Sequence, residues 1–66
     1  MDFGELLKKL RTEKGLSQED LALEIGTNPR AIYMMETGRR DPRISEVEIL
    51  LGYFGWEITY QKEQQA

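Results

Sequence analysis

The chain has 66 residues and a formal net charge of −3 at neutral pH, a length that suits one domain with a small core, which association with a second copy would stabilise further. The absence of cysteine and histidine excludes a disulfide framework, a thiolate metal site and an imidazole base, so we expect no metal, no cofactor and no enzymatic activity. No apolar run approaches the length of a membrane span and no signal-peptide pattern opens the chain, so we expect a cytoplasmic protein that does not contact membranes.

The first predicted helix covers residues 2–14. Asp2 is a suitable N-cap because Glu5 follows at the three-residue spacing of a capping box, and Gly15 suits the left-handed residue that ends a helix. One face of this helix carries apolar side chains at helical spacing, namely Phe3, Leu6, Leu7 and Leu10.

Two shorter helices are predicted next, over residues 18–25 and 29–36. Ser17 suits the N-cap of the first, and Pro29, directly after the capping residue Asn28, suits the first turn of the second. The side chains expected to point into the core from these two helices are Leu21, Ala22, Ile25, Ile32 and Met35.

A fourth helix is predicted near residues 45–54 and would end at Gly55. Its expected buried stripe consists of Ile44, Val47, Leu50, Leu51 and Phe54. The four helices would together form one domain over residues 1–55, while residues 62–66 are expected to be disordered.

The segment "WEITYQ", residues 56–61, alternates Trp56, Ile58 and Tyr60 with polar residues, which is the period of a β-strand. No second strand is predicted elsewhere, so the same segment of another copy is its natural partner in an antiparallel ribbon across a homodimer. These three side chains would then lie in the dimer interface. The alternatives are a fifth short helix or a frayed end.

Positive charge gathers between Arg30 and Arg43, in a stretch that holds four arginines and only two acidic residues. The protein is therefore expected to have one positive face despite its net negative charge, because phosphates are met by a local patch. The phosphates of a nucleic-acid backbone would there be contacted by Arg39, Arg40 and Arg43. The alternative is an ordinary solvated loop.

A short helix, a glycine and a second short helix meet the needs of a helix-turn-helix. The chain resembles the Cro and phage-repressor type (XRE) helix-turn-helix family from about Phe3 to Gly55, on the features "GLSQEDLA", Gly26, Ile32, "ETG" and the proline of "RDP". The resemblance implies a mainly α fold, a compact four-helix lambda-repressor-like DNA-binding domain, to which the predicted C-terminal strand would be added.

The resemblance also implies site residues. An arginine and a glutamate that pair in many members correspond to Arg11 and Glu36. The positions that face base edges are Thr27, Asn28, Pro29, Arg30, Tyr33 and Met34, of which Arg30 is best suited to a guanine. The phosphate-contacting residues are expected to be Arg11, Gln18, Arg39, Arg40 and Arg43.

The function that follows is a sequence-specific repressor, which would bind double-stranded DNA as a homodimer on a palindromic operator and block the promoter. The predicted strand adds a further hypothesis, because it resembles HipB-type antitoxins: the protein would also bind a cognate toxin and repress its own operon. The alternative is a protein-binding adaptor that has kept the fold without DNA binding, which the acidic composition favours.

Overall fold

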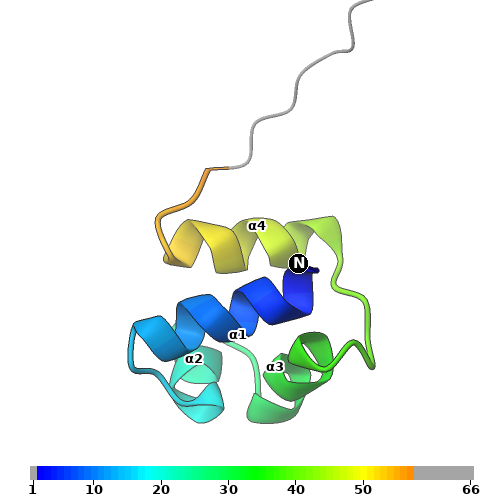
Figure 1. Cartoon of the computed structure of the whole chain (residues 1–66), viewed down its shortest axis with the longest axis horizontal. Coiled ribbons are helices and arrows are strands. Elements are labelled where there is room, and N and C mark those ends of the chain that lie inside the picture. Colours follow the sequence, from blue (N-terminus) through cyan, green and yellow to red (C-terminus); the bar gives the residue numbers. More distant parts are fainter. Residues whose placement is uncertain (1, 58–66) are drawn as a thin grey trace, which may run out of the picture.

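The computed structural model describes residues 2–57, which form four helices (Figure 1). These helices are α1 (Phe3–Glu13), α2 (Gln18–Ile25), α3 (Pro29–Glu36) and α4 (Ile44–Tyr53). The predicted helices are confirmed to within one residue at each end. The fold is the expected compact, mainly helical arrangement with a helix-turn-helix.

Side-chain caps fix where α1 and α3 begin. The Asp2 carboxylate accepts a hydrogen bond from the Glu5 backbone N–H at 2.8 Å, and the Asn28 side chain accepts one from the Ala31 N–H at 2.9 Å. Each bond satisfies a donor that the first helical turn leaves without an intrahelical partner. Pro29 follows Asn28 at the start of α3, where the missing N–H costs nothing.

The start of α2 has a reciprocal capping box. The Ser17 hydroxyl accepts from the Asp20 N–H at 2.9 Å, and the Asp20 carboxylate accepts from the Ser17 N–H at 3.0 Å. These hydrogen bonds from Ser17 lower the pKa of Asp20 below its ordinary value, because they favour the charged carboxylate. The sequence indicated Ser17 as the cap but not the returning contact from Asp20.

All four helices end in the same way, on a glycine with positive φ followed by a residue whose N–H returns to the helix. The donors are Leu16, Thr27, Arg39 and Trp56, and their acceptors are the carbonyls of Arg11, Ala22, Met34 and Leu51, at 2.8–3.1 Å. Each residue after the glycine is therefore tied to its helix, and this group includes the predicted functional residues Thr27, Arg39 and Trp56.

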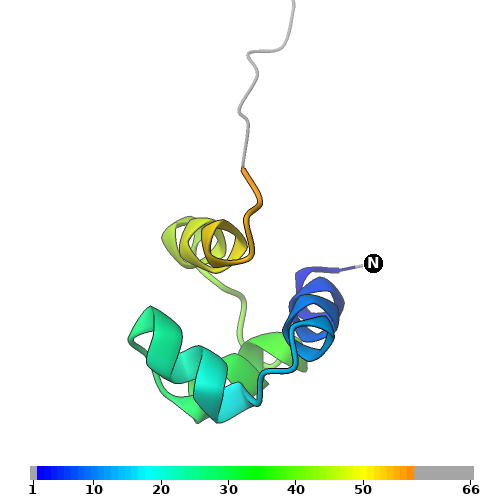
Figure 2. The same cartoon turned by 90° about the vertical axis from the view of Figure 1, so that its left-hand side faces the viewer.

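The core draws on every helix. Its fully or almost fully buried members are Leu7 from α1, Leu21 and Ala22 from α2, Ile32 and Met35 from α3, and Leu50 from α4. Phe3, Leu16, Ile25, Tyr53 and Phe54 are partly buried around it. In Figures 1 and 2, α4 lies at the top and α2 and α3 lie side by side at the bottom, while α1 lies at an intermediate height, to one side of α4 in Figure 2.

The N-terminal turn of α1 touches the C-terminal end of α3 through backbone. A Cβ on Gly4 would lie 2.6 Å from the Met35 carbonyl oxygen and 2.7 Å from that of Glu36. Real side chains do not tolerate such distances, so the two helices approach this closely only because residue 4 is glycine. The sequence offered no sign of this contact.

One predicted core residue was placed wrongly. Ile44 was expected in the buried stripe of α4, but it is 66% exposed. It is the first residue of α4, six residues before Leu50. The stripe is instead anchored two turns later at Leu50, which is fully buried.

The predicted C-terminal strand is not confirmed. Trp56 and Glu57 follow α4 without strand structure, and the described residues 2–57 contain no strand. Ile58 and Tyr60, with the rest of the predicted strand and the tail 62–66, lie outside the described residues. Within residues 2–57, none of the helices combines the length and the apolar character needed to cross a bilayer.

The contact at Gly4 can be tested by a pair of glycine substitutions. Gly4→Ala should lower the free energy of unfolding by about 1–3 kcal/mol, because the added methyl forces α1 away from α3. Gly52→Ala is the matched control, since a Cβ there meets nothing within 4 Å, and it should be neutral or raise the stability by up to about 1 kcal/mol. Urea denaturation followed by circular dichroism measures both, and equal effects would show that the close approach is unimportant.

Candidate nucleic-acid interface

The turn between α2 and α3 presents the start of α3 to solvent. Gly26 has φ 77°, which a side-chain-bearing residue adopts only at a cost, and the Thr27 N–H donates to the Ala22 carbonyl at 2.8 Å. The chain is thereby turned so that Asn28, Pro29 and Arg30, like Thr27, are exposed. Four of the six predicted base-contacting residues thus lie together in one exposed segment.

The other two, Tyr33 and Met34, lie one turn further along α3. Tyr33 is 41% exposed and Met34 is partly buried, whereas Ile32 and Met35 on the opposite side are buried in the core. The face of α3 that the core leaves uncovered is therefore the face predicted to meet bases. Arg30 has no ion-pair or hydrogen-bond partner for its side chain within residues 2–57, so its guanidinium is available.

Arg39 stacks on the Tyr33 ring. Its guanidinium carbon lies 5.5 Å from the ring centroid, a distance typical of a cation–π contact. The Arg39 N–H donates to the Met34 carbonyl at 2.9 Å, so the backbone of Arg39 is fixed to the end of α3. Arg39, a predicted phosphate contact, therefore lies directly against Tyr33, a predicted base contact.

Arg40 is engaged differently, in a two-pronged ion pair with α4. Its Nη1 and Nη2 donate to the two carboxylate oxygens of Glu46 at 2.9 and 2.6 Å. The Arg43 backbone N–H donates to Glu46 Oε1 at 2.8 Å, while the Arg43 residue is exposed. A single carboxylate therefore holds both the loop after α3 and the start of α4.

The predicted pair of Arg11 and Glu36 is present and almost fully enclosed. Arg11 Nε and Nη2 donate to the Glu36 carboxylate at 2.6 and 3.0 Å, and Nη1 donates to the Leu16 carbonyl at 2.8 Å. The two side chains are 10% and 2% exposed. The hydrogen bond to Glu36 raises the pKa of Arg11 above its ordinary value, although burial alone would lower it.

Gln18 joins the same network. Its side-chain amide donates to Glu36 Oε1 at 3.1 Å, and it is the first residue of α2. In the free protein, the Arg11 and Gln18 side chains are thus both turned toward Glu36. Their contact with phosphate stays a prediction, in which Gln18 would use its remaining amide proton and the free N–H groups at the start of α2.

A helix-turn-helix family model matches residues 7–61, which include all of α2, the turn and α3. The chain belongs to the Cro/C1-type (XRE) helix-turn-helix family. Membership supports DNA binding and a role in transcription regulation, and it agrees with the exposed outer face of α3.

The XRE chain is similar to two curated proteins. It is 38% identical over 52 residues, 74% of its length, to a Yarrowia lipolytica protein named as a multi-protein-binding factor 1. It is 34% identical over 58 residues, 88% of its length, to the HTH-type transcriptional activator BcrR of Enterococcus faecalis. The matches cover 34% and 28% of those proteins, so the chain spans about a third of the first and less of the second. No solved structure gives a significant match.

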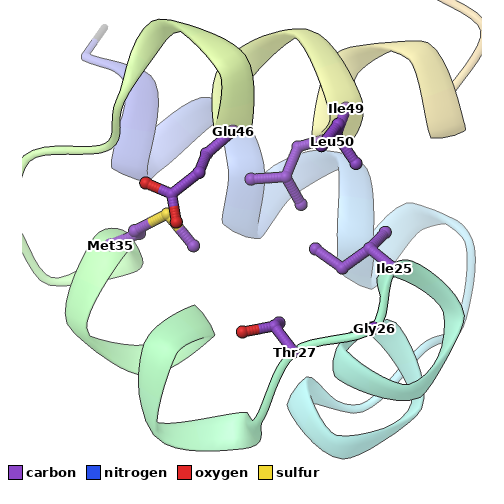
Figure 3. Close-up of a pocket in the computed structure, with 7 residues that line it drawn as sticks. All are labelled: Ile25, Gly26, Thr27, Met35, Glu46, Ile49 and Leu50. Carbon is purple, nitrogen blue, oxygen red and sulfur yellow. The ribbon is translucent and has the colours of Figure 1, made fainter.

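The XRE domain also has an open pocket of about 200 Å³ where α4 faces the helix-turn-helix (Figure 3). Its lining residues are Ile25, Gly26, Thr27, Met35, Glu46, Ile49 and Leu50. In Figure 3 the side chain of Thr27 points into this space rather than directly away from the domain. Thr27 is thus shared between the exposed turn and the pocket wall.

Sequence reasoning missed Glu46, which contacts two of the residues predicted to bind phosphate, Arg40 and Arg43. The sequence has no capping-box signal here, because the Arg43 side chain cannot accept a hydrogen bond and only the bond from the Arg43 N–H to Glu46 forms. The pairing of Glu46 with Arg40 was not predictable from the sequence either, since it depends on how the loop after α3 folds back. Trp56, the predicted dimer anchor, is 53% exposed.

The enclosed ion pair can be tested for its contribution to stability. Arg11→Met should lower the free energy of unfolding by about 3 kcal/mol, because Glu36 would then be an enclosed charge without its main partner. Lys8→Met is the matched control, as it removes an exposed positive charge from the same helix, and it should change stability by less than about 0.5 kcal/mol. Chemical denaturation measures both, and a small loss for Arg11→Met would contradict a structural role for the pair.

Proposed function

We propose that the protein is a sequence-specific DNA-binding regulator that binds a two-fold operator as a homodimer and represses transcription by covering promoter DNA. The single observation that carries the proposal is the outer face of α3, where Arg30 and the stacked pair of Tyr33 and Arg39 are exposed beside each other. An exposed helix face of this kind suits the major groove, which is wide enough to admit an α-helix.

Base contacts would come from the start and outer face of α3. The planar guanidinium of Arg30 matches the two acceptors of a guanine, which makes it the main specificity residue. Tyr33 offers a hydroxyl to a base edge or a phosphate. Pro29 and Met34 offer apolar surface to thymine methyl groups, and Thr27 and Asn28 would approach base edges from the turn.

Phosphate contacts would flank this face on two sides. Gln18 lies at the N-terminus of α2, where unpaired N–H groups and the helix dipole favour an anion. Arg39, Arg40 and Arg43 follow α3, with Arg11 behind Gln18. The exposed acidic residues of α2, namely Glu19, Asp20 and Glu24, oppose DNA binding only if they face it, so the net charge of −3 does not decide the matter.

The dimer would form through Trp56, Ile58 and Tyr60, with half-sites one helical turn, roughly 34 Å, apart. The exposed indole of Trp56 supports this, because its backbone is fixed to the end of α4 by the N–H bond to Leu51 at 2.8 Å. Large exposed aromatic groups on small domains mark association. An antitoxin role would add a toxin partner at the same end, and a toxin-like reading frame beside the gene would support it.

A protein-binding adaptor is the second candidate. The relative named as a multi-protein-binding factor 1 and the acidic composition favour it. Selection of bound sequences from a random DNA pool separates the two candidates. A two-fold consensus with half-sites one turn apart supports the regulator, whereas no enrichment of any sequence supports the adaptor.

Specificity should depend on Arg30 more than on the arginines after α3. Arg30→Ala should abolish discrimination between the selected operator and a scrambled duplex, a loss of about 1–3 kcal/mol per half-site. Arg43→Ala, a matched loss of an exposed arginine, should weaken binding to both duplexes alike and reduce the salt dependence of binding by about one unit of slope. Competition gel shifts measure both, and unchanged discrimination in Arg30→Ala would show that α3 does not read the bases through this residue.

The proposed dimer can be tested by placing a charge on either face of the predicted strand. Ile58→Asp should give a monomer and much weaker operator binding, because it puts a charge on the apolar face. Thr59→Asp adds the same charge to the other face and should leave the dimer intact. Sedimentation velocity decides the result, and a dimer that survives Ile58→Asp would remove the strand pairing.

A further inference from the structure

The pair of Arg40 and Glu46 places a carboxylate on one of the cations expected to meet DNA. Each terminal nitrogen of Arg40 donates one hydrogen bond to Glu46, at 2.9 and 2.6 Å. The side chains remain 37% and 29% exposed, so water and a phosphate can reach them. The pair is therefore accessible but electrically neutral, in contrast to the guanidinium of Arg30, which has no partner among the described residues.

The position of Glu46 lets it release Arg40 without losing all its partners. Its Oε1 also accepts the Arg43 backbone N–H at 2.8 Å, at the N-terminal turn of α4, where a negative charge is favourable. A carboxylate that keeps this bond is not left unsatisfied when a phosphate takes the guanidinium. Arg40 can thus change partners without disturbing the start of α4.

We propose that Glu46 competes with the DNA backbone for Arg40, and that this competition weakens the protein's attraction to DNA of any sequence. The proposal rests on the proposed DNA-binding function and adds a positioning residue to it. While the pair is closed, Arg40 contributes no net charge toward a phosphate. Binding then depends more on the base contacts of α3, and DNA gains the uncompensated charge of Arg40 only by displacing the carboxylate.

The test measures binding to a random-sequence duplex of about 20 bp and to the selected operator by fluorescence anisotropy, between about 50 and 200 mM salt. Glu46→Gln should bind both duplexes about two- to fivefold more tightly at the low-salt end, with a salt slope steeper by about 0.9, the increment of one phosphate contact. The amide oxygen of the substituted side chain can still accept the Arg43 N–H, so the helix cap is kept.

Two controls separate competition from a general change in charge. Glu24→Gln removes the same charge from the exposed surface of α2 and should leave the salt slope near that of the unaltered protein. In an Arg40→Ala background, Glu46→Gln should act only as Glu24→Gln does, because no guanidinium is left to release. If Glu46→Gln raised the affinity for DNA and the salt slope equally in the presence and absence of Arg40, the proposal would be overturned.

Glu46→Asp tests the contact at constant net charge. The shorter side chain keeps a carboxylate at the start of α4 but does not reach Arg40 as well, so the salt slope should again steepen. Weaker DNA binding by a folded Glu46→Gln or Glu46→Asp would overturn the proposal and make Glu46 a support of the loop. If the unaltered protein binds neither duplex at low salt, the proposed function fails; if it binds and the variants match it, only the competition fails.

Discussion

The contact between Arg11 and Glu36 holds together four separate parts of this small domain. Arg11 comes from α1, and it donates to Glu36 at the end of α3 and to the Leu16 carbonyl in the turn after α1. Gln18 donates to the same carboxylate from the start of α2. In a core with few fully buried side chains, this network fixes how the helix-turn-helix sits on α1, because Arg11 or Glu36 left alone would be an enclosed, unpaired charge.

The backbone contact at Gly4 strengthens the same region. It brings the first turn of α1 against the Met35 and Glu36 carbonyls, so the C-terminal end of α3 is held both by side chains and by close packing. The opposite end of α3 is attached through the turn, where the Thr27 N–H donates to the Ala22 carbonyl at 2.8 Å, while Pro29 and Arg30 are exposed. Both ends of α3 are therefore attached to the rest of the domain, while its outer face, with Arg30 and Tyr33, is exposed.

The arginines around this face differ in what they can do. Arg11 is bonded to Glu36 and to the Leu16 carbonyl, Arg39 lies on the Tyr33 ring, and Arg40 is paired with Glu46. The sequence predicted all three as phosphate contacts and gave only Arg11 a second, structural role as the partner of Glu36. Their differences come from side chains that only the folded chain brings into contact with them: Glu36 is 25 residues from Arg11, and Glu46 is six residues from Arg40.

The sequence alone determined the four helices, their order and the location of the helix-turn-helix. Those features are local: Asp2, Ser17 and Asn28 cap the helices, and a glycine ends each one within a few residues. Tertiary structure alone decided the close approach at Gly4, the exposure of Ile44 and the partner of Arg40. Each of these depends on which surfaces meet after the chain has turned back on itself, and residue type and spacing carry no information about distances between elements that far apart.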